Sequence, residues 1–200
     1  MGLCVDGHVL RGKNGNAGHA GHMFVSDNND ALCGCGNIGD VEGLIAGNAI
    51  PRRFAEQGYA DAAALLGAAR AGEPAAALLV DDLCRIMGRT LYNLVVTLDL
   101  QRISMGGSVF WHHRDFLLPK VRSHIDGKLA ALTHGFDLCA AGLGEKVGDY
   151  AALALVRRRG LGSLGRQRPG PAIGQVCQDG GQDRHELPAV PQQVGQLIEL

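Results

Sequence analysis

The residues best suited to chemistry lie near the start of the chain: His22, Cys33, Cys35 and Asp40. Imidazole and thiolate are ligands that zinc prefers, and a structural zinc site holds four ligands in a tetrahedral arrangement. Three glycines between Cys33 and Asp40 allow the backbone to turn tightly enough for the side chains to converge. The spacing therefore predicts a structural zinc site in which a carboxylate oxygen is the fourth ligand. The alternative is a pair of ordinary thiols in a glycine-rich turn beside a surface histidine.

The segment that carries these ligands, up to about residue 48, is rich in Gly, Asn and His and poor in helical periodicity. Such a segment is predicted to form a strand or hairpin followed by ordered loops. Apolar residues recur at helical spacing from Val41, so Asp40 is also predicted to be the N-cap of a helix. Pro51 either bends that helix or restarts it.

Beyond this helix the apolar pattern alternates between helical and strand-like segments, which predicts an α/β fold with helices packed on a sheet. The longest helix is predicted to start at Pro74 and to bury one apolar stripe over about 23 residues. A buried strand at 103–108 is predicted to run into the turn Gly106–Gly107. The other predicted elements are helices at 61–70, about 115–129 and 145–157, and a strand at 136–139.

Composition is typical of a globular protein, with 46% hydrophobic and 20% charged residues and a formal net charge of -1. A net charge near zero gives no electrostatic footprint for nucleic acid, so no nucleic-acid partner is expected. No stretch reaches the roughly 18 apolar residues that a membrane span needs, which predicts a cytoplasmic protein without a membrane partner. The six cysteines are scattered apart from one close pair, a pattern typical of reduced thiols.

The chain changes character after residue 156. Seven of the nine glutamines and four of the seven prolines lie in residues 157–200, which contain no aromatic residue and no apolar period. This span is predicted to be a poorly ordered tail, or the product of a change of reading frame. Residues 1–156 are predicted to form the folded domain, with the zinc-type loop at 19–42.

Several motifs together resemble the ROK family (repressor, open reading frame, kinase). Gly21-His22, followed by Cys-Gly-Cys-Gly at 33–36, is similar to the family's Gly-His and Cys-Gly-Cys-Gly-x-x-Gly-Cys-x-Glu patterns. Gly-Asn-Ala-Ile at 47–50 resembles its Ser-Gly-x-x-Ile motif, and residues 143–148 resemble its last conserved element. The resemblance covers about residues 3–156. It implies the C-terminal lobe of an actin-like, ribonuclease H-like ATPase fold, with the N-terminal lobe missing.

The resemblance also implies zinc at the four residues named above. Three of them match the family's ligands, while Asp40 stands at the position of the family's third cysteine. A carboxylate in place of a thiolate implies weaker zinc binding. The turn Gly106–Gly107 resembles the family's nucleotide turn and is implied to bind ATP with magnesium, although Ser108 stands where the family usually has a third glycine.

The family's sugar contacts match two residues here, His22 and Glu42. A further sugar-binding glutamate of the family is replaced by His19, which is then a sugar contact, another metal ligand or a loop residue. A carboxylate accepts two hydroxyl hydrogen bonds and an imidazole at most one, so a different substrate or affinity is implied.

The family's catalytic aspartate and its Asp-x-Gly-Gly-Thr phosphate loop match no residue here, so no catalytic residue is assigned. The implied function is ATP-dependent phosphorylation of a hexose or N-acetylhexosamine, in a truncated form that is inactive alone. The alternatives are a sugar-sensing ROK regulator without its DNA-binding domain and a metal-binding pseudoenzyme. A homodimer is one expected arrangement, because apolar surface next to a missing lobe would be paired with another copy.

Overall fold

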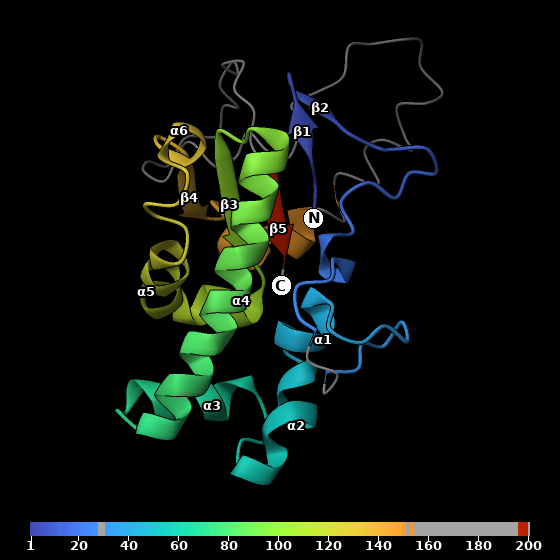
Figure 1. Cartoon of the computed structure of the whole chain (residues 1–200). Coiled ribbons are helices and arrows are strands. Elements are labelled where there is room, and N and C mark those ends of the chain that lie inside the picture. Colours follow the sequence, from blue (N-terminus) through green and yellow to red (C-terminus); the bar gives the residue numbers. More distant parts are fainter. Residues whose placement is uncertain (28–30, 151–152, 154–195, 200) are drawn as a thin grey trace.

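The computed structural model describes residues 1–27, 31–150, 153 and 196–199 (Figure 1). The chain starts with a short antiparallel hairpin, formed by β1 (Cys4–Val5) and β2 (His8–Val9). Loops then lead through the 3-10 helix η1 (Ala20–His22) to the first α-helix. The predicted hairpin followed by ordered loops is therefore confirmed for the described part of this segment.

Two short helices follow the loops. The helix α1 (Val41–Ile45) starts at the predicted N-cap, where the Asp40 carboxylate accepts a hydrogen bond of 2.8 Å from the backbone N–H of Gly43. The chain then restarts as α2 (Ala49–Phe54), which holds Pro51 in its first turn, where no intrahelical partner for an N–H exists. Of the two predicted effects of Pro51, the structure shows the restart. A single 3-10 turn, η2 (Ala55–Gln57), follows.

The helix α4 (Pro74–Leu98) runs through the main hydrophobic core. As predicted, it starts with a proline, which is favoured in the first helical turn. Its predicted apolar stripe is buried, and Leu91 in this stripe has no exposed surface. The preceding helix α3 (Ala62–Arg70) begins after its N-cap Asp61 and packs along α4.

A glycine sets how closely the next helix, α5 (Ser108–Ser123), approaches α4. A Cβ atom at Gly88 would lie 2.5 Å from the Cβ of His124 and 3.0 Å from the backbone oxygen of Val121. Atoms at such distances overlap, so a side chain at this position would force the two helices apart.

Three parallel strands form the sheet, in the order β4 (Asp137–Ala140), β3 (Arg102–Gly106) and β5 (Gln196–Glu199). The central strand β3 ends at Gly106, and the next residue, Gly107, has a φ of 97°, in the region that favours glycine. The two predicted strands are confirmed to within two residues. Of the predicted tail, 157–200, only β5 belongs to the described residues and is paired as a strand; for the rest the prediction is untested.

The helix after β3 differs from its predicted bounds of about 115–129. It begins directly after Gly107 and ends at Ser123, because burial of Phe110 (1% exposed) ties its first turn to the core. The backbone of α5 is interrupted at His113, which has φ of -120°. After α5 the chain turns and forms the single-turn helix α6 (Ala130–Thr133). Tertiary contacts have therefore moved the helix start by seven residues.

The single tryptophan connects two short segments that follow neighbouring strands, the first turn of α5 after β3 and a 3-10 helix after β4. Trp111, in the first turn of α5, covers Gly144, where a Cβ atom would lie 2.6 Å from the indole ring. The guanidinium group of Arg114 lies 4.2 Å from the centre of the same ring. Gly144 belongs to the 3-10 helix η3 (Gly144–Lys146), which follows β4. The indole thus packs the first turn of α5 against η3, near the carboxyl ends of β3 and β4.

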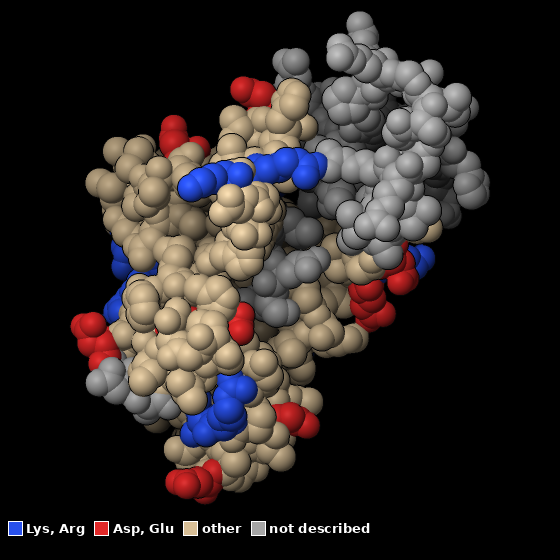
Figure 2. Space-filling model, turned by 90° about the vertical axis from the view of Figure 1, so that its right-hand side faces the viewer, with Lys and Arg blue, Asp and Glu red and all other residues tan. Residues whose placement is uncertain are grey.

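The described residues form a mixed α/β structure, as predicted. The predicted helix at 145–157 is present as η3 and helical residues 147–150, and of the remainder of that predicted span only residue 153 is described. No single helix in the described ranges is long and apolar enough to cross a membrane, and α3 passes that test only together with α4, across a bend of 116°. Figure 2 shows Lys and Arg in separate groups on one face, with Asp and Glu between them.

Candidate metal cluster and polar pocket

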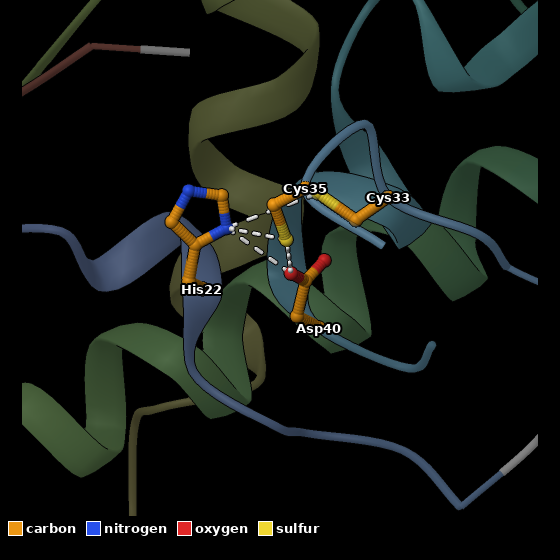
Figure 3. A group of neighbouring side chains, drawn as sticks. All are labelled: His22, Cys33, Cys35 and Asp40. Carbon is orange, nitrogen blue, oxygen red and sulfur yellow. Dashed lines mark hydrogen bonds and ion pairs between the residues drawn. The ribbon is translucent and has the colours of Figure 1, made fainter. Parts of the chain in front are cut away.

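Four side chains converge on one point beside α1 (Figure 3). His22 ends η1, Cys33 and Cys35 lie in the following loop, and Asp40 caps α1. The His22 Nδ1 atom lies 3.1 Å from Asp40 Oδ2, 3.6 Å from Cys35 Sγ and 3.8 Å from Cys33 Sγ. The Cys35 Sγ atom is 3.6 Å from Asp40 Oδ2. The structure thus brings together all four residues that the sequence suggests as metal ligands.

The loop that carries both thiols is shaped by a backbone hydrogen bond and by two glycines. The N–H of Cys33 donates to the carbonyl oxygen of Asn37 at 2.8 Å. Gly36 and Gly39 have φ of 92° and 81°, which an L side chain rarely adopts. These turns direct the thiols toward the carboxylate of Asp40, so two of the three glycines have the role that the sequence predicts for them.

A small apolar cluster beneath the loop holds it against α1 and α4. Its buried members are Val25, Ala31, Val41, Leu44 and Ile86. Gly43 permits the close contact, because a Cβ atom there would lie 2.8 Å from the Ala31 carbonyl oxygen and 3.1 Å from the Cys33 nitrogen. The start of α1, and with it Asp40, is therefore fixed relative to the first thiol.

The geometry of the cluster fits a tetrahedral zinc ion. Metal–ligand bonds of about 2.0 to 2.3 Å at tetrahedral angles place the ligand atoms about 3.3 to 3.8 Å from one another. The four separations given above, 3.1 to 3.8 Å, lie close to this range, and all the ligand atoms lie within 4.8 Å of one another. One imidazole, two thiols and one carboxylate also form a donor set that zinc accepts.

Within the cluster, the Asp40 carboxyl is ionised while the Cys33 thiol stays protonated. Burial raises the pKa of the Asp40 carboxyl, but hydrogen bonds from the Gly43 N–H, His22 and the thiols outweigh it and lower the pKa. The backbone N–H of Cys35 lowers the pKa of the Cys33 thiol, whereas burial, the Cys35 thiol and the Asp40 carboxylate together raise it to about 12. A carboxylate therefore lies beside a protonated thiol, and a bound cation would displace the thiol proton.

A polar pocket of about 210 Å³ adjoins the cluster. Among its lining residues are all three of the suggested sugar contacts, His19, His22 and Glu42. The rings of His19 and His22 stack with their centroids 6.2 Å apart and an interplanar angle of 15°. The Glu42 Oε1 atom accepts a hydrogen bond from the Cys33 thiol, with Sγ at 3.5 Å. The pocket and the cluster therefore share His22 and are joined by Glu42.

The suggested nucleotide turn, Gly106–Gly107, is not among the residues that line this pocket. It lies at the carboxyl end of the central strand and at the start of α5. In open α/β sheets, ligands bind at the carboxyl ends of the strands, and bare glycine backbone permits close approach. Its position therefore suits a ligand separate from that of the polar pocket.

Two contributors to the site carry no signal in the sequence. The backbone carbonyl oxygen of Asn16 lies 2.8 Å from His19 Nδ1 and orients that ring. The guanidinium group of Arg89, in α4, donates to the carbonyl oxygen of Val25 at 2.9 Å and ties the loop to the core helix. Both contacts use main-chain oxygens, which every residue has, so no pattern of side chains reveals them.

The chain belongs to the ROK family, whose sequence profile matches residues 1–159. It is 36% identical over 111 residues to an N-acetylmannosamine kinase of Citrobacter koseri, covering 54% of this chain and 37% of that protein. It also resembles the structure of a ROK family glucokinase from Streptomyces griseus in complex with glucose and AMPPNP. That similarity has a TM-score of 0.63 at 29% identity and covers 78% of this chain and 56% of the glucokinase.

A ROK family transcriptional regulator, a homologue of the E. coli MLC protein, has a similar structure as well. Its TM-score is 0.59 at 24% identity, covering 70% of this chain and 38% of the regulator, which shows a shared fold alone. The chain thus spans between 37% and 56% of the length of these relatives. The suggested family, and with it the likeness to an actin-like kinase fold, is confirmed.

Proposed function

We propose that this chain carries the sugar-binding part of a ROK carbohydrate kinase, which transfers phosphate from ATP to a hexose or N-acetylhexosamine. The observation that carries the proposal is the convergence of His19, His22 and Glu42 on one polar pocket in a chain of this family. The names of the relatives support the substrate class, since one is an N-acetylmannosamine kinase and another holds glucose.

The pocket side chains would bind sugar hydroxyl groups. The Glu42 carboxylate can accept hydrogen bonds from two hydroxyls, and each imidazole can make one bond through its free ring nitrogen. A pocket of about 210 Å³ admits a single small ligand rather than an oligosaccharide. The proposed ligand is therefore one monosaccharide unit.

A second ligand, ATP with magnesium, would bind near Gly106–Gly107, where it supplies the phosphoryl group. The support is the position of this turn between a central parallel strand and a helix of 16 residues. Bare backbone there permits close approach, and the first N–H groups of α5 have no intrahelical partner and suit phosphate.

Zinc would have a structural role in this proposal. His22, both loop thiols and Asp40 would hold it, and it would fix the loop against α1 so that His22 keeps its place in the pocket wall. The weaker binding expected of a carboxylate ligand belongs to the same proposal.

Turnover by these 200 residues alone is not expected. Phosphoryl transfer to a hydroxyl uses a carboxylate base beside that hydroxyl, a contribution of roughly a hundredfold to ten-thousandfold. Among the pocket residues, Glu42 is the one carboxylate, and it accepts a hydrogen bond from Cys33. We propose that the base belongs to the part of the relatives that this chain does not match.

Calorimetric titration with glucose and N-acetylmannosamine tests the proposal. We expect the wild-type chain to bind one of these sugars, and Glu42→Gln to weaken binding about tenfold, because a hydrogen bond to a charged group contributes about 1.5 to 3 kcal/mol. Glu56→Gln is the matched control, since Glu56 is exposed in η2 and lies outside the pocket. Binding of neither sugar would overturn the sugar site, and robust sugar-dependent ADP release would overturn the expected lack of turnover.

Because the ROK family includes transcriptional regulators as well as kinases, a second candidate is the sugar-sensing part of a ROK regulator. Such a chain would use the same pocket but would not need the nucleotide turn. Titration with AMPPNP separates the two candidates. A kinase chain binds AMPPNP at Gly106–Gly107, whereas a sugar sensor binds the sugar and no nucleotide; zinc binding without either ligand would favour the metal-binding pseudoenzyme.

A further inference from the structure

An apolar cavity of about 80 Å³ lies in the main hydrophobic core. Residues of the helices α1 to α5 and of the strand β3 line it. It shares no lining residue with the polar pocket, and neither Gly106 nor Gly107 is part of its wall. The cavity is therefore a third place for a ligand, apart from the proposed sugar and nucleotide sites.

The wall of the cavity is too apolar to hold water. Its lining side chains contain no nitrogen or oxygen atom, and their one acidic group is the thiol of Cys84. Burial raises the pKa of this thiol to about 12, so it stays neutral. A buried water needs two to four polar partners, so the cavity should be dry, although its volume is several times the roughly 10 to 15 Å³ that one water requires.

The deepest part of the wall consists of polarizable groups. Cys84 and Met87 of α4, Met105 of β3 and Phe110 of α5 line the cavity, and each is at most 4% exposed. Atoms that face an empty space lose dispersion contacts on that side. Sulfur and aromatic groups are polarizable and suit an apolar partner. An apolar ligand that fills the space would therefore restore contacts that the wall lacks.

The cavity reaches the surface beside the first turn of α5. Among its lining residues Gly47 is exposed and Val109 is half-buried. Gly47 has no side chain to close this gap, and a Cβ atom there would lie 3.5 Å from the Cγ2 of Val109. The backbone of α5 is interrupted at His113, between the lining residues Val109 and Leu117. The first turn can therefore move apart from the rest of the helix and widen the gap.

From these observations we propose that the cavity binds one small neutral apolar molecule, no larger than benzene, which enters between Gly47 and Val109. An apolar cavity of roughly 150 Å³ in another protein stays dry and binds benzene or xenon. The present cavity has about half that volume, so xenon and cyclopropane fit it better than benzene does. The inference goes beyond the proposed kinase function and does not depend on it.

Xenon NMR of the full chain tests the site. We expect a saturable shift of the xenon resonance, as binding at one site requires. Ala62→Leu places a larger side chain in the cavity wall and should abolish this shift. The matched control is Ala63→Leu, which adds the same side chain at an exposed position of α3 outside the cavity and should bind xenon like the wild type. No saturable shift in the wild type, or an equal shift in Ala62→Leu, would overturn the proposal.

A variant with a larger cavity tests the site in the opposite direction. Leu66→Ala removes most of a buried lining side chain and should bind benzene about tenfold more tightly than the wild type, because the added volume accommodates the ring. The rise in melting temperature with benzene concentration measures this affinity. Circular dichroism shows whether each variant has folded. Where Ala62→Leu has not, this comparison decides, and a melting temperature of Leu66→Ala that benzene does not raise would overturn the proposal.

The chemistry of the ligand and its entrance are tested by competition and by exchange. Cyclopropane should displace xenon, whereas tetramethylammonium, a compact cation, should not, because no lining side chain is charged at neutral pH. Gly47→Val should slow xenon exchange, since its side chain would contact Val109. Displacement by the cation would overturn the apolar class of ligand, and unchanged exchange would overturn the entrance. Neither result depends on sugar or nucleotide binding, so the kinase proposal is tested separately.

Discussion

At the scale of a single residue, Asp40 both caps the helix α1 and belongs to the metal cluster. Its Oδ1 atom accepts from the Gly43 N–H and starts α1, while its Oδ2 atom faces His22 and the Cys35 thiol. A cysteine, which the family pattern has at this position, offers only one sulfur atom. The carboxylate therefore joins the start of a helix to the metal cluster in one fully buried side chain.

Two substitutions of Asp40 should separate these tasks. Asp40→Asn keeps an oxygen for the helix cap but loses the charge, so it should bind zinc at least about tenfold more weakly and leave the cap intact. Asp40→Cys should bind zinc more tightly but should destabilise the metal-free chain by about 1 kcal/mol, the usual contribution of a cap. Competitive zinc titration and thermal unfolding in EDTA measure both effects. If both variants changed the zinc affinity in the same direction, Asp40 would not have the two separate roles described.

The exposed thiol should be essential for metal binding. Cys35→Ser removes a ligand that lies 3.6 Å from both His22 Nδ1 and Asp40 Oδ2, and we expect the zinc content of the purified chain to fall from about one ion to nearly none. The control is Cys139→Ser. Cys139 lies in β4 outside the cluster, so this variant should retain its zinc. Equal zinc content in both variants, measured by elemental analysis, would exclude the cluster as the site.

At the scale of elements, the packing of α4 against α5 requires a glycine at position 88, whereas α3 does not require one at position 67. Gly88 allows close contact between α4 and the end of α5, while Gly67, exposed in α3, has no atom within 4 Å of where its Cβ would be. Helix propensity alone would make alanine favourable by about 0.5 to 1 kcal/mol at both positions.

The same substitution should therefore have opposite effects at these two sites. Gly67→Ala should raise the free energy of unfolding by about 0.5 to 1 kcal/mol. Gly88→Ala should lower it by about 1 to 3 kcal/mol, because the new methyl group overlaps the backbone oxygen of Val121. Urea unfolding of both variants gives the comparison. A stabilising Gly88→Ala would mean that the two helices are not held as closely as described.

The elements also show which features a sequence can predict. The start of α4 and the cap of α1 follow from local rules for proline and aspartate, and the metal ligands follow from thiol and imidazole chemistry. The start of α5 does not follow from such local rules, because His112 and His113 look like solvated residues and give no sign that the helix already begins at Ser108. Only the packing of Phe110 and the contact of Trp111 with Gly144 explain the helical turn there. The pocket wall likewise depends on the carbonyl oxygen of Asn16, which has no side-chain signature.

At the scale of the whole molecule, groups with shifted pKa values make the stability depend on pH, Cys33 of the metal cluster among them. Hydrogen bonds lower the pKa of Asp40 despite its burial, and the hydrogen bond from Arg70 lowers that of Asp115, so both stabilise the folded state above the ordinary value of 3.8. Burial lowers the pKa of His113 below 6.5, and its contribution is lost as the pH falls below that value. Burial raises the pKa of Cys84 from 9.0 to about 12, so its contribution is present below pH 9 and lost above it.

The melting temperature of the metal-free chain should therefore be highest between about pH 6.5 and 9. It should fall on the acid side, first through His113 and then through the carboxylates, and on the alkaline side through Cys33 and Cys84. Cys84→Ala should lower the whole curve, because it leaves a cavity, but should flatten its alkaline side. Differential scanning calorimetry across the pH range measures this. An equally steep alkaline decline in the variant would show that other groups control it.

The contact between Trp111 and Gly144 has a practical consequence. Because the chain has a single tryptophan, all of its indole fluorescence arises where the first turn of α5 packs on η3, a few residues after Gly106–Gly107. The emission should therefore shift when AMPPNP reaches that turn and should stay nearly constant when sugar alone fills the separate polar pocket. The chain thus contains its own optical probe, which needs no label and reports nucleotide arrival independently of sugar. Emission that responds to sugar alone would indicate that the two sites communicate through the core.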